Sequence, residues 1–142
     1  MLVPGNAATR GIRNHNWLNI RYNEANDWDG QTGPDAEGFA KFQGPEWGIR
    51  AAAKLLVNYQ DWYGINTVKE IVERWAPAAD DNDTVSYIRH VSDVLGVHPM
   101  EAFDVRERLQ QLLEVMALHE SGALPIGAEQ VIYQGINMAG VV

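Results

Sequence analysis

The chain has 142 residues, which is the usual size of one domain and is long enough to bury an independent core. Its hydrophobic content of 46% and charged content of 21% are typical of a folded globular protein and exclude a wholly disordered chain. The net charge of -8 argues against a nucleic-acid partner, because phosphate binding needs clustered Lys and Arg. Cysteine is absent, so disulfides, thiolate metal sites and a cysteine nucleophile are excluded.

The first residues, MLVPGNAATRG, have neither the basic start nor the apolar core of a signal peptide. Further along, no apolar run approaches the roughly 20 residues that a membrane span requires. We therefore expect no membrane span. If the protein acts outside a cytoplasm, we expect a route of delivery other than a signal peptide.

The first 45 residues are rich in Gly, Asn, Asp and Trp, with turn signals such as Asp29-Gly30 and Gly44-Pro45. Within this region the alternating segment 38–42 predicts a short strand, and the segment 19–22 is its expected partner. A small β-hairpin is therefore expected in the N-terminal third.

From Pro45 onward the pattern becomes helical, with apolar residues recurring at 3.6-residue spacing. Capping residues and glycine or proline at the ends delimit four predicted helices. They cover residues 45–63, 67–75, 83–95 and 104–120. The sequence thus predicts a mainly α protein, a helical core with a small β-hairpin.

Residues 1–125 are predicted to form one domain, and residues 126–142 to form a C-terminal extension that packs on this domain or docks from it. The extension contains three glycines and few charges. This composition is compatible with a short strand with loops or with a docking segment, and the sequence alone does not choose between them.

The acidic run from Asp80 to Asp83 has adjacent carboxylates, without the spacing and the glycine of a calcium loop. Asp and Asn at this place are explained by their preference for helix N-caps. The four histidines show no ligand spacing such as an i, i+4 pair. We therefore expect no metal and no cofactor.

Glu120 is the acidic residue of greatest chemical interest, because it falls on the apolar stripe of the last predicted helix. At about 100° per residue, its side chain points in the same direction as those of Leu112, Leu113 and Met116. Burial raises the pKa of a carboxyl group and makes it a proton donor, which the cleavage of a glycosidic bond requires. In the structural alternative, Glu120 turns outward with the last turn or pairs with an arginine.

Three segments carry motifs that belong together in known enzymes: Glu-Ser-Gly-Ala-Leu-Pro at 120–125, Gly-Phe-Ala-Lys-Phe at 38–42 and Gly-Pro-Glu-Trp at 44–47. They resemble the catalytic Glu-Ser-Gly-x-x-Pro motif, the Gly-Leu-Met-Gln strand and the following helix start of lytic transglycosylases and goose-type lysozymes. The resemblance implies that Glu120 is the catalytic acid of a lysozyme-like fold. In that superfamily the Glu motif precedes the strand, whereas here it follows by about eighty residues, which implies a circular permutation.

A second set of motifs extends over most of the chain, from residue 10 to residue 125. It includes Gly-Ile-Arg-Asn at 11–14, Gly-Gln-Thr-Gly at 30–33 and Arg-Trp-Ala-Pro at 74–77. These motifs resemble those of a family of phage virion structural proteins. That family typically has Asn-Pro-Gly-Asn-Ile where this chain has Asn-Trp-Leu-Asn-Ile at 16–20.

Further candidate site residues follow from the needs of a glycan cleft. Asp35 and Glu37 are candidates for the second carboxylate of a lysozyme, although Pro34-Asp35 is also a turn signal. A lytic transglycosylase needs only one Glu, and the absence of a clear second carboxylate favours that reaction. Sugar rings bind to aromatic platforms and neutral amides, and the candidate sugar-binding residues are Asn19, Phe42, Gln43, Trp75 and Tyr87. Trp47 and Trp62 are assigned to the core.

Together these features predict a virion-associated enzyme that cleaves the bond between N-acetylmuramic acid and N-acetylglucosamine in peptidoglycan, as a lytic transglycosylase or a muramidase. Its expected partners are peptidoglycan glycan strands and other virion proteins. It would be made in the host cytoplasm, carried in the phage particle and act in the host periplasm or cell wall during genome delivery. Two alternatives stay open: a non-catalytic virion structural or cement protein with a lysozyme-like fold, and a glycan-binding module.

Overall fold

The computed structural model describes residues 8–80 and 82–142. Residue 81, in the acidic run, and residues 1–7, in the segment considered for a signal peptide, lie outside the described residues. In the described part of the chain the elements are α1 (Arg10–Arg13), β1 (Gln31–Pro34), β2 (Ala40–Phe42), α2 (Pro45–Tyr63), α3 (Val68–Trp75), the 3-10 turn η1 (Ala78–Asp80), α4 (Thr84–Leu95), α5 (Leu109–Ser121) and α6 (Ala128–Ala139). The prediction of a mainly α protein with a small hairpin in its N-terminal third is confirmed.

The helices begin and end at the residues that local chemistry favours. Helix α2 has Pro45 in its first turn, where the missing N–H costs no hydrogen bond. Thr67 caps α3 by accepting a hydrogen bond of 3.2 Å from the backbone N–H of Glu70. Asp83 caps α4 in the same way, accepting a bond of 3.1 Å from the backbone N–H of Ser86.

Helix α5 begins at Leu109, five residues later than predicted. Asp104, the expected start, accepts a hydrogen bond of 3.0 Å from the backbone N–H of Arg106, two residues further on. The backbone N–H of Val105 donates to the side chain of Gln60 in α2 at 2.8 Å. These contacts hold the segment in turns, because an Asp side chain that bonds to a nearby N–H competes with helix formation.

The hairpin differs from the prediction in its pairing. Strand β2 pairs antiparallel with β1, and not with the expected segment 19–22. That segment contributes an isolated bridge between Arg21 and Phe39, and the N–H of Ala40 donates to the carbonyl of Ile20 at 2.9 Å. It therefore lies along the other edge of β2 without forming a continuous strand.

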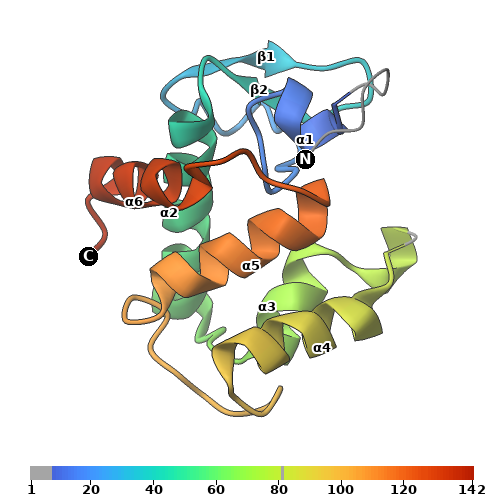
Figure 1. Ribbon diagram of the computed structural model, residues 1–142, viewed down its shortest axis with the longest axis vertical. Helices are drawn as coiled ribbons and strands as arrows, with labels where there is room; N and C mark the ends of the chain where they lie inside the picture. Colours follow the sequence, from blue (N-terminus) through green and yellow to red (C-terminus); the bar gives the residue numbers. More distant parts are fainter. Residues whose placement is uncertain (1–7, 81) are drawn as a thin grey trace.

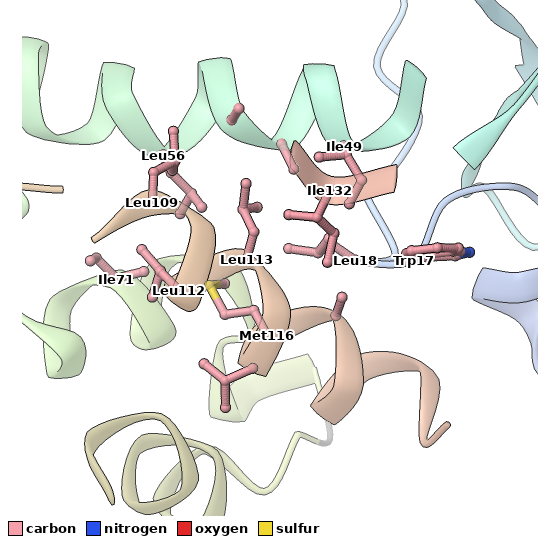
Figure 2. Close-up of a cluster of buried hydrophobic side chains, with 14 of the residues drawn as sticks. Trp17, Leu18, Ile49, Leu56, Ile71, Leu109, Leu112, Leu113, Met116 and Ile132 are labelled. Atoms are coloured by element: carbon pink, nitrogen blue, oxygen red, sulfur yellow. The ribbon is translucent and has the colours of Figure 1, made fainter. Parts of the chain in front are cut away.

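Helix α5 crosses the middle of the molecule, between the N-terminal segment with its hairpin at one end and helices α3 and α4 at the other (Figure 1). Its apolar side chains meet side chains from four other parts of the chain. Figure 2 shows Leu109, Leu112, Leu113 and Met116 of α5 among Ile49 and Leu56 of α2, Ile71 of α3, Ile132 of α6, and Trp17 and Leu18 of the N-terminal segment. This cluster is the core of the protein.

The C-terminal segment forms helix α6, which lies across α2. A helix is not the short strand that the sequence left open for this segment, and the docking role stays a prediction. Its Ile132 and Ile136 are buried in the shared core. Helices α6 and α2 are in such close contact at Gly135 that a Cβ atom there would lie 2.5 Å from the Ile49 side chain. Only glycine allows the two helices to approach in this way. The predicted boundary at residue 125 stays a prediction.

The two tryptophans assigned to the core differ. Trp47 is partly buried and packs against the core cluster. Trp62 is 69% exposed, so its assignment was wrong. It lies near the end of α2, on the side away from the apolar stripe. Among the described residues, no helix combines the length and the apolar character that crossing a membrane requires.

Candidate active site

A cleft of about 1040 Å³ separates the N-terminal segment from helices α2 and α3. One wall is built by residues 19–26 together with Glu37 and Phe39. The other wall comes from α2, α3 and the turn after α3. Glu120, in the last turn of α5, opens into this cleft. The cleft thus brings the predicted catalytic acid and the loop before β2 to one site.

The N-terminal segment fixes the end of α5 through Ser121, the neighbour of Glu120. The Ser121 hydroxyl donates to the carbonyl of Trp17 at 2.8 Å, and the Thr9 hydroxyl donates to the carbonyl of Ser121 at 3.1 Å. A side chain at Gly11 would lie within 2.6 Å of the Ser121 hydroxyl oxygen. Glycine is therefore required at position 11 for this close contact, and the contact fixes the end of α5, where Glu120 lines the cleft.

The Glu120 carboxyl group is half-buried and has an amide donor beside it. Asn19 Nδ2 donates to Glu120 Oε1 at 3.1 Å and to the Glu120 carbonyl at 3.3 Å. Burial raises the pKa of Glu120 above its ordinary value of 4.5, although the contacts with Asn19 and Tyr87 and the charge of Arg10 oppose the shift. A carboxyl group in this environment keeps its proton to a higher pH and is suited to donate it.

Tyr87 of α4 lies beside Glu120, and both line a smaller hollow next to the cleft. Burial raises the pKa of Tyr87 well above 10.0, and the negative charge of Glu120 adds to the effect. The phenol is therefore neutral and remains a hydrogen-bond donor. Its buried hydroxyl has no well-aligned partner among the described residues, which leaves it free to turn toward the Glu120 carboxylate or a ligand.

His119 stacks on the Tyr87 ring, with 4.0 Å between centroids and 23° between planes. Its Nδ1 lies 3.0 Å from Nδ1 of His90. Burial lowers the pKa of His119, and His90 lowers it further, whereas Asp83 raises it. No group of three or more metal-ligating side chains occurs in the described residues. The histidine pair therefore supports the Tyr87 ring, which in turn lies against Glu120.

Glu37 lines the same cleft as Glu120, and two side chains connect them. Arg10 lies 3.5 Å from the Glu37 carboxylate, and its Nε donates to Asn19 Oδ1 at 3.3 Å. The Arg10 guanidinium also stands 3.6 Å from the centroid of the Phe39 ring. The order of contacts is thus Glu37, Arg10, Asn19, Glu120.

Asp35 does not line the cleft. Its carboxylate accepts bonds of 2.8 Å from the backbone N–H groups of Glu37 and Phe39 and from the Asn14 side chain. Although burial acts in the opposite direction, these bonds and one from the backbone of Gly38 hold the pKa of Asp35 below its ordinary value of 3.8. Asp35 shapes the turn before β2, as the turn signal in the sequence indicated.

The predicted sugar-binding residues are divided by the fold. Asn19 and Trp75 line the cleft, and the Trp75 indole N–H donates to the carbonyl of Leu18 at 3.0 Å. Tyr87 lies next to Glu120 in the smaller hollow. Phe42, only 3% exposed, belongs to the core, and Gln43 lies outside the cleft, so neither contributes to its lining.

The sequence analysis missed most of the cleft lining, including Arg10, Arg21, Tyr59 and Arg74. They lie on separate segments of the chain. Tyr59 falls on the apolar face of the predicted helix 45–63, whereas periodicity does not distinguish the three arginines. Arg10 directly precedes the motif at 11–14 and Arg74 is the first residue of the motif at 74–77, but nothing in those motifs indicates that the two arginines face a common space.

Comparison with known proteins places the chain among phage proteins. No model of a known protein family matches it. Protein P5 of Pseudoalteromonas phage PM2 is 34% identical in an alignment of 131 residues that covers 89% of this chain and 79% of the phage protein. The chain belongs to the Protein P5 family. Membership of the Protein P5 family confirms the predicted relation to a phage protein, whereas the lysozyme-like fold and the circular permutation stay predictions.

Proposed function

We propose that this chain is a virion-associated enzyme that cleaves peptidoglycan glycan strands, with Glu120 as its catalytic acid. Its place in a virion, and other virion proteins as partners, are supported by its membership of a phage protein family. The observation that carries the enzymatic proposal is the position of Glu120. It is a half-buried carboxyl group with a raised pKa that lines a cleft of about 1040 Å³.

The first step uses the protonated carboxyl group. As the bond between the sugar C1 and the bridging oxygen breaks, Glu120 transfers its proton to that oxygen, which leaves as a hydroxyl group. Asn19 and Tyr87 then have a role, because both are placed to donate hydrogen bonds to the carboxylate that remains. They stabilise the charged form that the proton transfer produces.

The second step distinguishes a lytic transglycosylase from a muramidase. In the transglycosylase, the Glu120 carboxylate takes the proton of the muramyl 6-hydroxyl, whose oxygen bonds to C1 and closes a 1,6-anhydro ring. In the muramidase, water supplies the oxygen and a second carboxylate assists. Glu37 is the cleft carboxylate that Arg10 and Asn19 connect to Glu120. Its carboxylate is paired with Arg10 and is therefore less available to assist a water molecule. The transglycosylase reaction needs Glu120 alone, and we favour it.

The test is a zymogram on purified peptidoglycan with the wild type, Glu120→Gln and the control Glu107→Gln. Glu107 is exposed and lies outside the cleft, so its variant changes the net charge equally. We expect Glu120→Gln to lose about 100-fold or more of the activity and Glu107→Gln to keep it. Clearing by Glu120→Gln at the wild-type rate would show that another residue is the acid. Mass spectrometry of the fragments then separates 1,6-anhydro products from hydrolysed ones.

A non-catalytic virion structural protein is the second candidate, and one contact favours it. Asn19 bonds to both the main chain and the side chain of Glu120, so the carboxylate also ties the N-terminal segment to α5. If this were its only role, the wild type would clear no peptidoglycan and Glu120→Gln would weaken the fold. Chemical denaturation of both proteins, read beside the zymogram, distinguishes the two candidates.

A further inference from the structure

The end of the cleft formed by α2 and α3 contains an arginine held by aromatic rings. The Arg74 guanidinium lies 4.8 Å from the centroid of the Tyr63 ring and 5.4 Å from that of Tyr59. Tyr59 in turn meets the edge of Trp75, with 6.1 Å between centroids. Contacts with two rings limit the positions of an arginine side chain and orient its planar group. Arg74 therefore enters the cleft in a restricted orientation, although the residue is exposed.

Within residues 8–80 and 82–142, the charge of Arg74 is not balanced by an acidic partner. Among the described residues, no carboxylate lies within 4.0 Å of its guanidinium. Glu24 and Asp80 line the same cleft, but neither forms an ion pair with it. By comparison, the cleft arginine Arg10 is bound to Glu37. Arg74 thus offers all five of its N–H donors to a ligand.

The cleft combines basic and acidic side chains, and its acidic residues are Glu24, Glu37, Asp80 and Glu120. The chain carries a net charge of -8 and only 11 Lys and Arg, of which three, Arg10, Arg21 and Arg74, line the cleft. An oriented guanidinium next to aromatic rings fits a ligand that has both an apolar face and a carboxylate, because the planar group binds a carboxylate through two parallel hydrogen bonds. A neutral glycan would leave this charge without a partner.

We propose that Arg74, with Tyr59 and Tyr63, forms a subsite for a carboxylate borne by the muramyl residue of the glycan. This inference rests on the proposed function, since it takes a peptidoglycan strand as the occupant of the cleft. The carboxylate belongs either to the lactyl group of the sugar or to the peptide attached to it. The tyrosines hold the guanidinium in place, and the Arg74 charge selects muramyl-containing strands over neutral polymers of N-acetylglucosamine.

The experiment measures binding by isothermal titration in a Glu120→Gln background, so that no ligand is cleaved. Three probes are used: a disaccharide of N-acetylglucosamine and N-acetylmuramic acid with a free lactyl carboxylate, its methyl ester, and the disaccharide-peptide. The further substitution Arg74→Gln is compared with Arg89→Gln. Arg89 is an exposed arginine of α4 outside the cleft, so it controls for the change of net charge.

We expect the protein with Arg74 to bind at least one of the two carboxylate probes about tenfold more tightly than the ester, which is the contribution of one charge-assisted pair. The probe that is preferred identifies the source of the carboxylate. Arg74→Gln should remove the preference, Arg89→Gln should keep it, and Tyr63→Ala should reduce it by releasing the guanidinium.

Two outcomes would overturn the subsite: an equal affinity for all probes, or a preference that persists in Arg74→Gln, including one that is lost in Arg21→Gln instead. Arg21 is the comparison because it also lines the cleft and lies over a ring, 4.8 Å from the centroid of Phe39. Binding in the Glu120→Gln background is independent of turnover. A wild type that fails to clear peptidoglycan would therefore refute the proposed enzyme and leave the result for the subsite readable.

Discussion

Helix α5 passes through two regions that are held together by different forces. Along most of its length Leu112, Leu113 and Met116 are fully buried among hydrocarbon side chains of the surrounding helices (Figure 2). In its last turn Glu120 and Ser121 meet the N-terminal segment through hydrogen bonds to side chains and backbone. The first region is packed almost entirely with apolar side chains, whereas the second has a carboxyl group at the edge of a cleft.

One part of α5 therefore contributes mainly to stability, and the other part carries the group of chemical interest. Burial of apolar surface is non-directional and contributes most of the free energy of folding. Hydrogen bonds contribute less net free energy, but they fix the position and the pKa of a functional group. Substitutions in the core half of α5 should therefore change the free energy of unfolding, and substitutions at its cleft end should change the titration and activity of Glu120.

The largest change in stability is expected for Leu113→Ala in the core half. It removes a fully buried side chain and leaves a cavity, and should lower the free energy of unfolding by about 2–5 kcal/mol. Leu118→Ala is the matched control on the same helix, because that leucine is 40% exposed and should cost much less. Chemical denaturation measures both. Similar losses for the two variants would contradict the position of α5 at the centre of the core.

A smaller effect is expected for Asn19 at the cleft end. Its φ of 53° lies in the left-handed region, which Asn tolerates better than Ala. Asn19→Ala should lower the free energy of unfolding by roughly 1–2 kcal/mol, through the backbone conformation and the lost bonds to Glu120. Asn19→Gly removes the same bonds without the backbone penalty and should cost less.

Both Asn19 variants should also raise the pKa of Glu120 further, because they remove the amide that favours its charged form. An NMR titration of the Glu120 side chain measures the shift. An unchanged or lower pKa in either variant would show that Asn19 does not act on the carboxylate.

The smallest effect is a pH dependence of stability that has opposite signs at two carboxyl groups. The folded-state pKa of Glu120 is raised by burial, so its favourable contribution is complete below its ordinary pKa of 4.5 and is lost as the pH rises through the folded-state value. Glu120→Gln should therefore gain stability relative to the wild type as the pH rises above 4.5. The Asp35 pKa is lowered by hydrogen bonds that outweigh its burial, and its contribution is present above 3.8 and lost as the pH falls.

Asp35→Asn should accordingly be less stable than the wild type at neutral pH, and the difference should shrink in acid. Denaturation curves recorded from pH 3 to pH 8 compare the two variants. A difference of the same sign for both would mean that the fold stabilises the charged form of Glu120 and lowers its pKa, which would contradict the raised pKa described above.

The helical part of the fold was largely predictable, because its information is local. Thr67 and Asp83 cap their helices as expected, and Pro45 begins the longest one. The late start of α5 and the existence of α6 were not predicted. The first depends on the bond between Val105 and Gln60 of another helix, and the second on a glycine that fits against Ile49.

The candidate site was predictable in its central residue and not in its surroundings. Glu120 lies on an apolar helical stripe, which periodicity reveals. Phe42 also fits the alternating pattern of a strand, but the pattern does not say which face of the strand other elements cover. In the structure Phe42 is buried in the core. Arg74 had no distinguishing pattern, since its role depends on the rings of Tyr59 and Tyr63 on a neighbouring helix.

The sequence by itself therefore determined the helical class, most helix ends and the acidic residue of chemical interest, because capping and periodicity act between residues that are near in the chain. Only the tertiary structure decided that Glu120 meets Asn19 and Tyr87, that Asp35 shapes a turn, and that Arg74 shares the cleft. Residues 19 and 120 are a hundred positions apart, and their hydrogen bond exists only because the N-terminal segment packs on the end of α5.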